Sequence, residues 1–174
     1  MIVAVALFAT VMVISVSTLL SLVKANRKAQ AIQSVMNNLN IALDGMVRAA
    51  REGSTFHGCN ASNLTTPEDC PNGGSVFAFR PRGLVSEPVW IYSFDEGTHR
   101  LERSVTGNIS DLSPITAPEI TIDDMRFYVV GTTPGDIFQP KVIITIKGSA
   151  GVAGTSARTT FHIQATAVQR VLDL

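Results

Sequence analysis

The sequence predicts an α+β protein in which one long N-terminal helix packs on an antiparallel β-sheet. The first third of the chain has helical periodicity, and most of the remainder alternates with the period of two that is typical of strands. An amphipathic helix and a sheet with one apolar face cannot bury their hydrophobic sides alone, so we expect each to cover the other. The chain divides into an apolar helix half at 1–23, an amphipathic helix half at 24–52 and a globular domain at 53–174.

The opening run, residues 1–23, contains no charged side chain. At about 1.5 Å per residue it makes a helix of roughly 35 Å, long enough to cross a hydrocarbon core of about 30 Å. Only a helix or a closed barrel satisfies its backbone hydrogen bonds in lipid, and one segment cannot close a barrel. The run therefore predicts a single membrane-spanning helix.

The same helix is predicted to continue beyond the apolar run to about Glu52. No proline occurs between Lys24 and Glu52, and Gly45 is the only glycine there, while Gly53 and Ser54 mark the end. A membrane anchor followed by a separate helix is the alternative, although no linker composition separates the halves. The second half carries one apolar stripe at three- and four-residue spacings. We expect the following stripe residues to face the sheet: Ile32, Val35, Met36, Leu39 and Leu43.

Strand patterns follow the helix. Residues 54–74 are rich in turn formers and predict a surface loop. Strands are then predicted at 75–79, 89–94, 99–105, 119–130, 141–147 and 159–168. The second and third of these form the clearest hairpin, and the last two pair by adjacency. Phe161 and Ile163 on the inward side of the final strand complete the expected helix–sheet contact.

Two cysteines, Cys59 and Cys70, lie close together in the predicted loop. Their spacing and context favour a disulfide over a metal site, and two unrelated free thiols are the alternative. Closing this loop restricts the unfolded chain by about 3 kcal/mol in the chain-entropy model. Such a bond persists only in an oxidising compartment, so the pair favours a location outside the cytoplasm.

Enzyme chemistry is not indicated. The histidines lack ligand spacing, and no nucleophile-elbow, P-loop or paired-cysteine redox motif is present. We therefore expect no metal site, no cofactor and no catalytic residues. The formal net charge of +0 gives no support for a nucleic-acid binder.

The N-terminal run resembles that of a known family. Ile2 to Thr10 (IVAVALFAT) and the uninterrupted continuation Lys24 to Lys28 (KANRK) are similar to the helix of the type IV pilin superfamily. That superfamily includes major and minor pilins and the pseudopilins of type II secretion. The resemblance implies a filament subunit that assembles through its apolar helix, where small and β-branched residues allow close packing. The expected packing positions are Val5, Ala6, Ala9, Val13, Val16 and Leu20.

The resemblance also implies partners: other pilin-like subunits, inner-membrane lipid before assembly, a prepilin peptidase and an assembly platform. The family carries a basic leader and Gly-Phe-Thr-Leu-x-Glu directly before such a run. We expect these ahead of Met1, so neither the processing site nor the glutamate that follows it can be assigned within this sequence.

Two topology signals oppose each other. Lys24, Arg27 and Lys28 follow the span with nothing basic before it, which by the positive-inside rule places the domain in the cytoplasm. The cysteine pair places it outside. A basic leader ahead of Met1 resolves the conflict, so we expect an extracytoplasmic domain that becomes extracellular in an assembled filament. The alternative function is a single-pass, membrane-anchored binding module.

Overall fold

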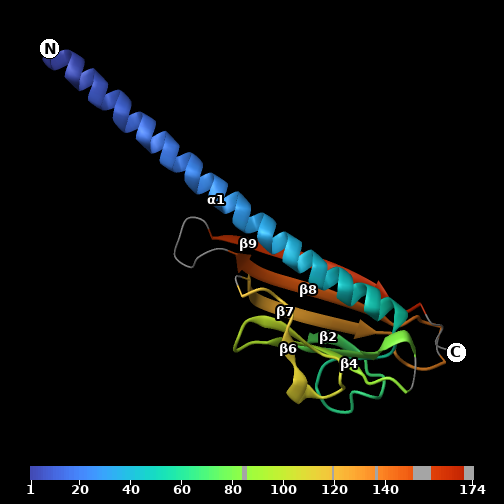
Figure 1. Cartoon of the computed structure of the whole chain (residues 1–174). Helices are drawn as coiled ribbons and strands as arrows, with labels where there is room; N and C mark the ends of the chain where they lie inside the picture. Colours follow the sequence, from blue (N-terminus) through green and yellow to red (C-terminus); the bar gives the residue numbers. More distant parts are fainter. Residues whose placement is uncertain (84–85, 119, 136, 151–157, 171–174) are drawn as a thin grey trace.

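The structure is a computed structural model, and it describes residues 1–83, 86–118, 120–135, 137–150 and 158–170. One long helix, α1 (Ile2–Glu52), projects from a domain built of two antiparallel sheets (Figure 1). We call this β-rich part the head domain. The α+β class is confirmed.

Helix α1 runs through both predicted halves without a break, so the alternative of two separate helices is wrong. It ends at Gly53, whose N–H donates to Ala50 O at 2.9 Å. The φ of Gly53 is −83°, so the end is not a left-handed glycine cap. A Cβ at this position would lie 2.4 Å from Phe79 Cδ2, so glycine is required here by the close approach of β3.

The strands form two sheets rather than the single sheet expected from the sequence. The five-stranded sheet has the order β1-β3-β4-β5-β6, and the four-stranded sheet has the order β2-β7-β8-β9. The first comprises β1 (Ser54–His57), β3 (Val76–Arg80), β4 (Trp90–Asp95), β5 (Arg100–Ser104) and β6 (Ser113–Pro114). The second comprises β2 (Cys70–Gly74), β7 (Ile120–Val130), β8 (Lys141–Ala150) and β9 (Thr159–Val168). Two short 3-10 turns are η1 (Pro81–Gly83) and η2 (Ile109–Asp111).

Several strand predictions are confirmed. Strands β4 and β5 pair as the expected hairpin, and β8 pairs with β9 along its whole length. Strand β7 has a register shift against β8 between Ile122 and Asp124. Strand β8 continues to Ala150, beyond the end predicted at residue 147.

The loop predicted at 54–74 is partly wrong, because it contains both β1 and β2. Strand β2 reads Cys-Pro-Asn-Gly-Gly, a composition that disfavours strands. It is extended because it adds to the edge of β7, where Cys70 lies opposite Val129 and Gly74 opposite Phe127. Tertiary pairing therefore overrides the local preference.

The main core lies between the two sheets and α1. The helix contributes Val35, Leu39 and Leu43, all buried, together with Met46 and Ala50. Ile32 is half-buried, and Phe161 and Ile163 of β9 are half-buried residues packed against this core. Aromatic side chains from β1, β3 and β7 fill the centre, with ring centroids 5.3–6.2 Å apart: Phe56, Phe77, Phe79 and Phe127.

The prediction for Met36 is wrong, because 37% of this residue is exposed. The buried residues of α1 recur every three or four positions from Val35. Met36 follows Val35 directly and is therefore rotated about 100° around the helix, away from the sheet. Its apolar side chain lies on the flank of the stripe.

Candidate functional site

The most distinctive surface of the molecule is the free half of α1. Every residue from 1 to 23 is exposed, and the segment extends away from the head domain (Figure 1). Its most apolar stretch has a mean hydropathy of 2.5, and α1 is long and apolar enough to cross a membrane. An exposed apolar surface of this extent is typical of a segment that contacts lipid or other protein chains.

The hydroxyl side chains of this half are satisfied within the helix. Ser15 donates to Val11 O at 2.8 Å, Ser17 to Val13 O at 2.7 Å and Thr18 to Ile14 O at 2.9 Å. Thr10 does the same to Leu7 O at 2.8 Å. A hydroxyl that bonds to its own helix needs no water partner, so these residues interrupt the apolar surface little.

The six expected packing residues lie on this free half. Val5, Ala6, Ala9, Val13, Val16 and Leu20 are all exposed, and their spacing places them on one side of the helix. Val5 and Val13 are each 67% exposed. The structure thus leaves this side open, and the role of the six residues in packing stays a prediction.

Three basic residues form a collar where the apolar half ends. Lys24, Arg27 and Lys28 follow one another at positions i, i+3 and i+4, so they project on one side of α1. The first acidic residue of the helix is Asp44, four turns further on. Among the described residues no ion pair joins any of the three. The collar therefore places positive charge beside the apolar surface, as is typical of a helix segment at a lipid headgroup layer.

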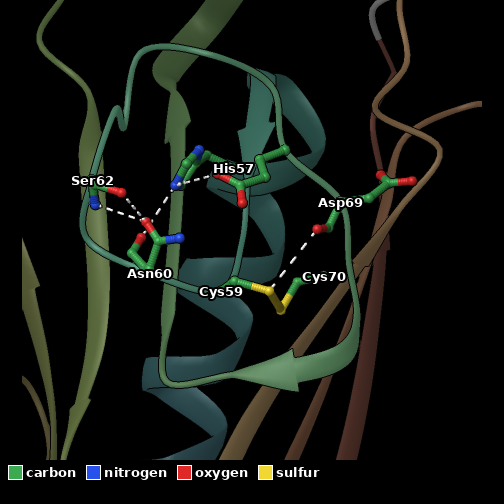
Figure 2. The surroundings of a disulfide bond; sticks show 7 residues. His57, Cys59, Asn60, Ser62, Asp69 and Cys70 are labelled. Carbon is green, nitrogen blue, oxygen red and sulfur yellow. Dashed lines mark hydrogen bonds and ion pairs between the residues drawn. A yellow bond between two sulfur atoms is a disulfide. The ribbon is translucent and has the colours of Figure 1, made fainter.

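The cysteines form the predicted disulfide. Cys59 and Cys70 are bonded at a sequence separation of 11, and the bond joins the segment just after β1 to the start of β2. Because these strands belong to different sheets, the bond ties the two sheets together at this point. Figure 2 shows the bond at the base of the loop that the two cysteines enclose.

His57 is the internal support of this loop, which the sequence did not reveal. Its side chain is fully buried, with Nδ1 2.9 Å from Thr66 O and Nε2 3.1 Å from Asn60 O. Nε2 also lies 3.6 Å from a carboxylate oxygen of Glu68 (Figure 2). The imidazole therefore connects both sides of the loop, and it holds the chain in a fixed path between the two cysteines.

The β4–β5 hairpin carries two perturbed groups. Burial raises the pKa of Tyr92, and a hydrogen bond with Arg103 on the paired strand opposes this rise. Asp95 accepts hydrogen bonds from the Thr98 hydroxyl and the Gly97 N–H, each at 2.8 Å, and these bonds lower the pKa of its carboxyl group. Asp95 thus stabilises the predicted turn.

Histidine, cysteine, aspartate and glutamate side chains form no group of three or more suited to a metal ion among the residues that the structure describes. His99 lies near Ile122 O at 3.0 Å, whereas His162 is exposed on β9. The three histidines therefore do not converge on one site.

Comparison with known proteins adds no assignment. The chain matches no protein-family model, no curated protein and no solved structure.

Proposed function

We propose that the chain is a structural subunit of a type IV pilus or of a type II secretion-like filament, and that it assembles through the free half of α1. The observation that carries this proposal is the continuity of α1. One unbroken helix has a fully exposed apolar half and a half docked in the core of the head domain. Such a helix joins the head domain rigidly to whatever surrounds its apolar half.

The resemblance of the segment from Ile2 to Thr10 to pilin-like helices supports the same proposal. In this reading the apolar half lies in the inner membrane before assembly and among the helices of neighbouring subunits afterwards. Small residues such as Ala6 and Ala9 let those helices approach closely. A prepilin peptidase and an assembly platform are the further partners that the resemblance implies.

The disulfide supports an extracytoplasmic head domain. A bond between Cys59 and Cys70 persists in an oxidising compartment and is reduced in most cytosols. The basic collar then lies at the outer surface of the inner membrane, against the positive-inside rule. In this proposal the oxidising environment that the disulfide requires outweighs the positive-inside signal of the collar.

The test is a charge placed in the packing side. Ala9→Arg buries an unpaired guanidinium among the helices of a filament, so filaments sheared from cells should lose the protein. Position 9 is exposed and far from the head domain, so the variant should fold and remain in the membrane fraction. Asn40→Ala, on an exposed part of the docked half, is the matched control and should assemble normally. Normal filaments from Ala9→Arg would contradict the proposal.

The second candidate function is a single-pass, membrane-anchored binding module. This alternative is favoured because the head domain has its own core, to which no residue of the apolar half belongs. In that case the full chain is a monomer in detergent and never enters the sheared filament fraction.

A further inference from the structure

A pocket of about 480 Å³ lies beside the last turns of α1. Its walls come from α1, from η1, from Glu87 in the segment before β4, and from the β4–β5 hairpin. Its size is within the range of about 300–1,000 Å³ that small-molecule sites occupy. The filament role proposed above makes no use of this pocket.

The pocket is lined by charged side chains of both signs. Arg48 of α1, Arg82 of η1 and Arg103 of β5 bring three guanidinium groups, and Glu52 and Glu87 bring two carboxylates. Within the described ranges no ion pair joins any of these five residues. Arg103 hydrogen-bonds to Tyr92, so Arg48 and Arg82 are the guanidinium groups most available to an anionic ligand. The three arginines together carry one more positive charge than the two carboxylates balance.

An aromatic ring holds one of these groups in place. Arg103 Cζ lies 5.6 Å from the centre of the Trp90 ring, and Trp90 itself is half-buried against Phe79 of the core. A cation stacked on an indole keeps its N–H groups in a defined plane. Arg103 is thus pre-oriented at the wall of the pocket, and part of the indole forms an apolar surface beside it.

Two locally unfavourable residues line the same pocket. Arg82 has φ 55° and ψ 16°, the left-handed conformation that L-residues with a side chain rarely adopt. Gly45 lies inside α1, where glycine destabilises a helix, yet a Cβ added there meets nothing within 4 Å. Packing within this chain therefore does not require a glycine at position 45. Both residues are explained if a ligand occupies the space beside them.

We propose that this pocket binds an acidic sugar of the uronic-acid type. Its carboxylate fits the planar, forked N–H groups of the arginines. Its hydroxyl groups can donate to Glu52 and Glu87, which only accept, and the apolar face of the sugar ring can lie against Trp90. A simple anion would leave both carboxylates without donors, and a neutral sugar would leave the arginines without an anion.

The experiment measures binding by isothermal titration calorimetry on the full, oxidised chain in detergent micelles. The probe is a short oligogalacturonate, and the neutral galactose oligomer of the same length is its control. The wild-type chain should bind the acidic probe, and the neutral oligomer should bind roughly tenfold more weakly or not at all.

Two variants separate binding from folding. Arg82→Gly removes a guanidinium and relieves the left-handed strain, while Gly45→Leu fills the open space and favours the helix. Both should unfold at the same or a higher urea concentration than the wild type, yet bind oligogalacturonate roughly tenfold more weakly. Arg126→Ala is the matched control, because Arg126 pairs with Asp124 outside the pocket, and its binding should be unchanged.

Failure to bind oligogalacturonate would overturn the proposal, as would equal binding of the neutral oligomer or undiminished binding by Arg82→Gly and Gly45→Leu. Binding of an acidic peptide without binding of the sugar would also overturn it, and would make the pocket a protein contact. Each outcome is independent of whether the chain enters filaments.

Discussion

The two halves of α1 belong to one helix and differ in what surrounds them. The apolar half is rich in valine and leucine, and every one of its side chains is exposed. The docked half is more polar overall, yet Val35, Leu39 and Leu43 are buried against the sheets. A leucine contributes to the stability of a fold only where other atoms of the fold remove it from water. The apolar half therefore adds little to the stability of the fold and is open to contacts with surrounding lipid or protein. The docked half stabilises the fold of the head domain.

The largest expected difference is between matched leucines in the two halves. Leu43→Ala should lower the free energy of unfolding by about 2 to 5 kcal/mol, because it leaves a cavity in the main core. Leu20→Ala, which removes the same atoms from an exposed position, should change it by less than about 0.5 kcal/mol. Urea unfolding of the full chain in detergent, followed by tryptophan fluorescence, measures both through Trp90.

Met36→Ala is the internal control for this comparison. Met36 lies in the docked half but on its exposed flank, so its truncation should resemble that of Leu20 rather than that of Leu43. Equal losses at Leu43 and Leu20 would mean that docking on the sheets does not distinguish the two halves.

The disulfide should affect only the docked half and the head domain. Replacing both Cys59 and Cys70 with serine should lower the free energy of unfolding of the head domain by about 3 kcal/mol, because the loop is no longer closed in the unfolded chain. The apolar half contacts neither sheet, so its helical circular dichroism in detergent should persist after the head domain has unfolded. A variant that loses all helix in one transition would show that the halves are not independent.

The smallest expected effect is in the response to pH. No ionisable side chain occurs between Ile2 and Val23, so pH-dependent stability from side chains arises beyond the apolar half. The pKa of Asp95 is lowered from 3.8, first by its hydrogen bond from Thr98 and then by that from Gly97. Folding therefore favours the ionised carboxylate, and its contribution is present above about pH 3.8 and is lost as the pH falls through the lowered pKa. Asp95→Asn should lose less stability than the wild type between neutral pH and pH 3, measured by urea midpoints. A steeper acid loss in Asp95→Asn would contradict this assignment.

The sequence was sufficient to predict the helix and the hairpins whose residue pattern is local. The helix follows from uninterrupted periodicity up to Gly53, and the β4–β5 and β8–β9 hairpins follow from alternating side chains around turn residues. The disulfide pairing was predictable because the chain has two cysteines and a loop context for both.

Features that depend on contacts between segments far apart in the sequence could not be predicted in the same way. Strand β2 is extended only because β7 lies beside it, and alternation along a strand does not say which of two sheets it joins. The error at Met36 arose because an apolar residue adjacent to a stripe looks like a member of it. The pocket brings Arg48, Arg82 and Arg103 together from three elements, and no spacing in the sequence connects them.

The alignment of α1 with the sheet it covers has a mechanical consequence. The helix lies mainly along β9 and also contacts η1 and β8, and its axis runs nearly parallel to the two strands (Figure 1). A pull on the N-terminal end of α1 is therefore transmitted along β9 rather than across it. Strand β9 is paired with β8 from Thr159 to Val168, so the pull loads the hydrogen bonds of that whole ladder in shear at the same time. Bonds loaded together resist more force than bonds opened one after another, so this ladder favours resistance to a pull along the axis of α1.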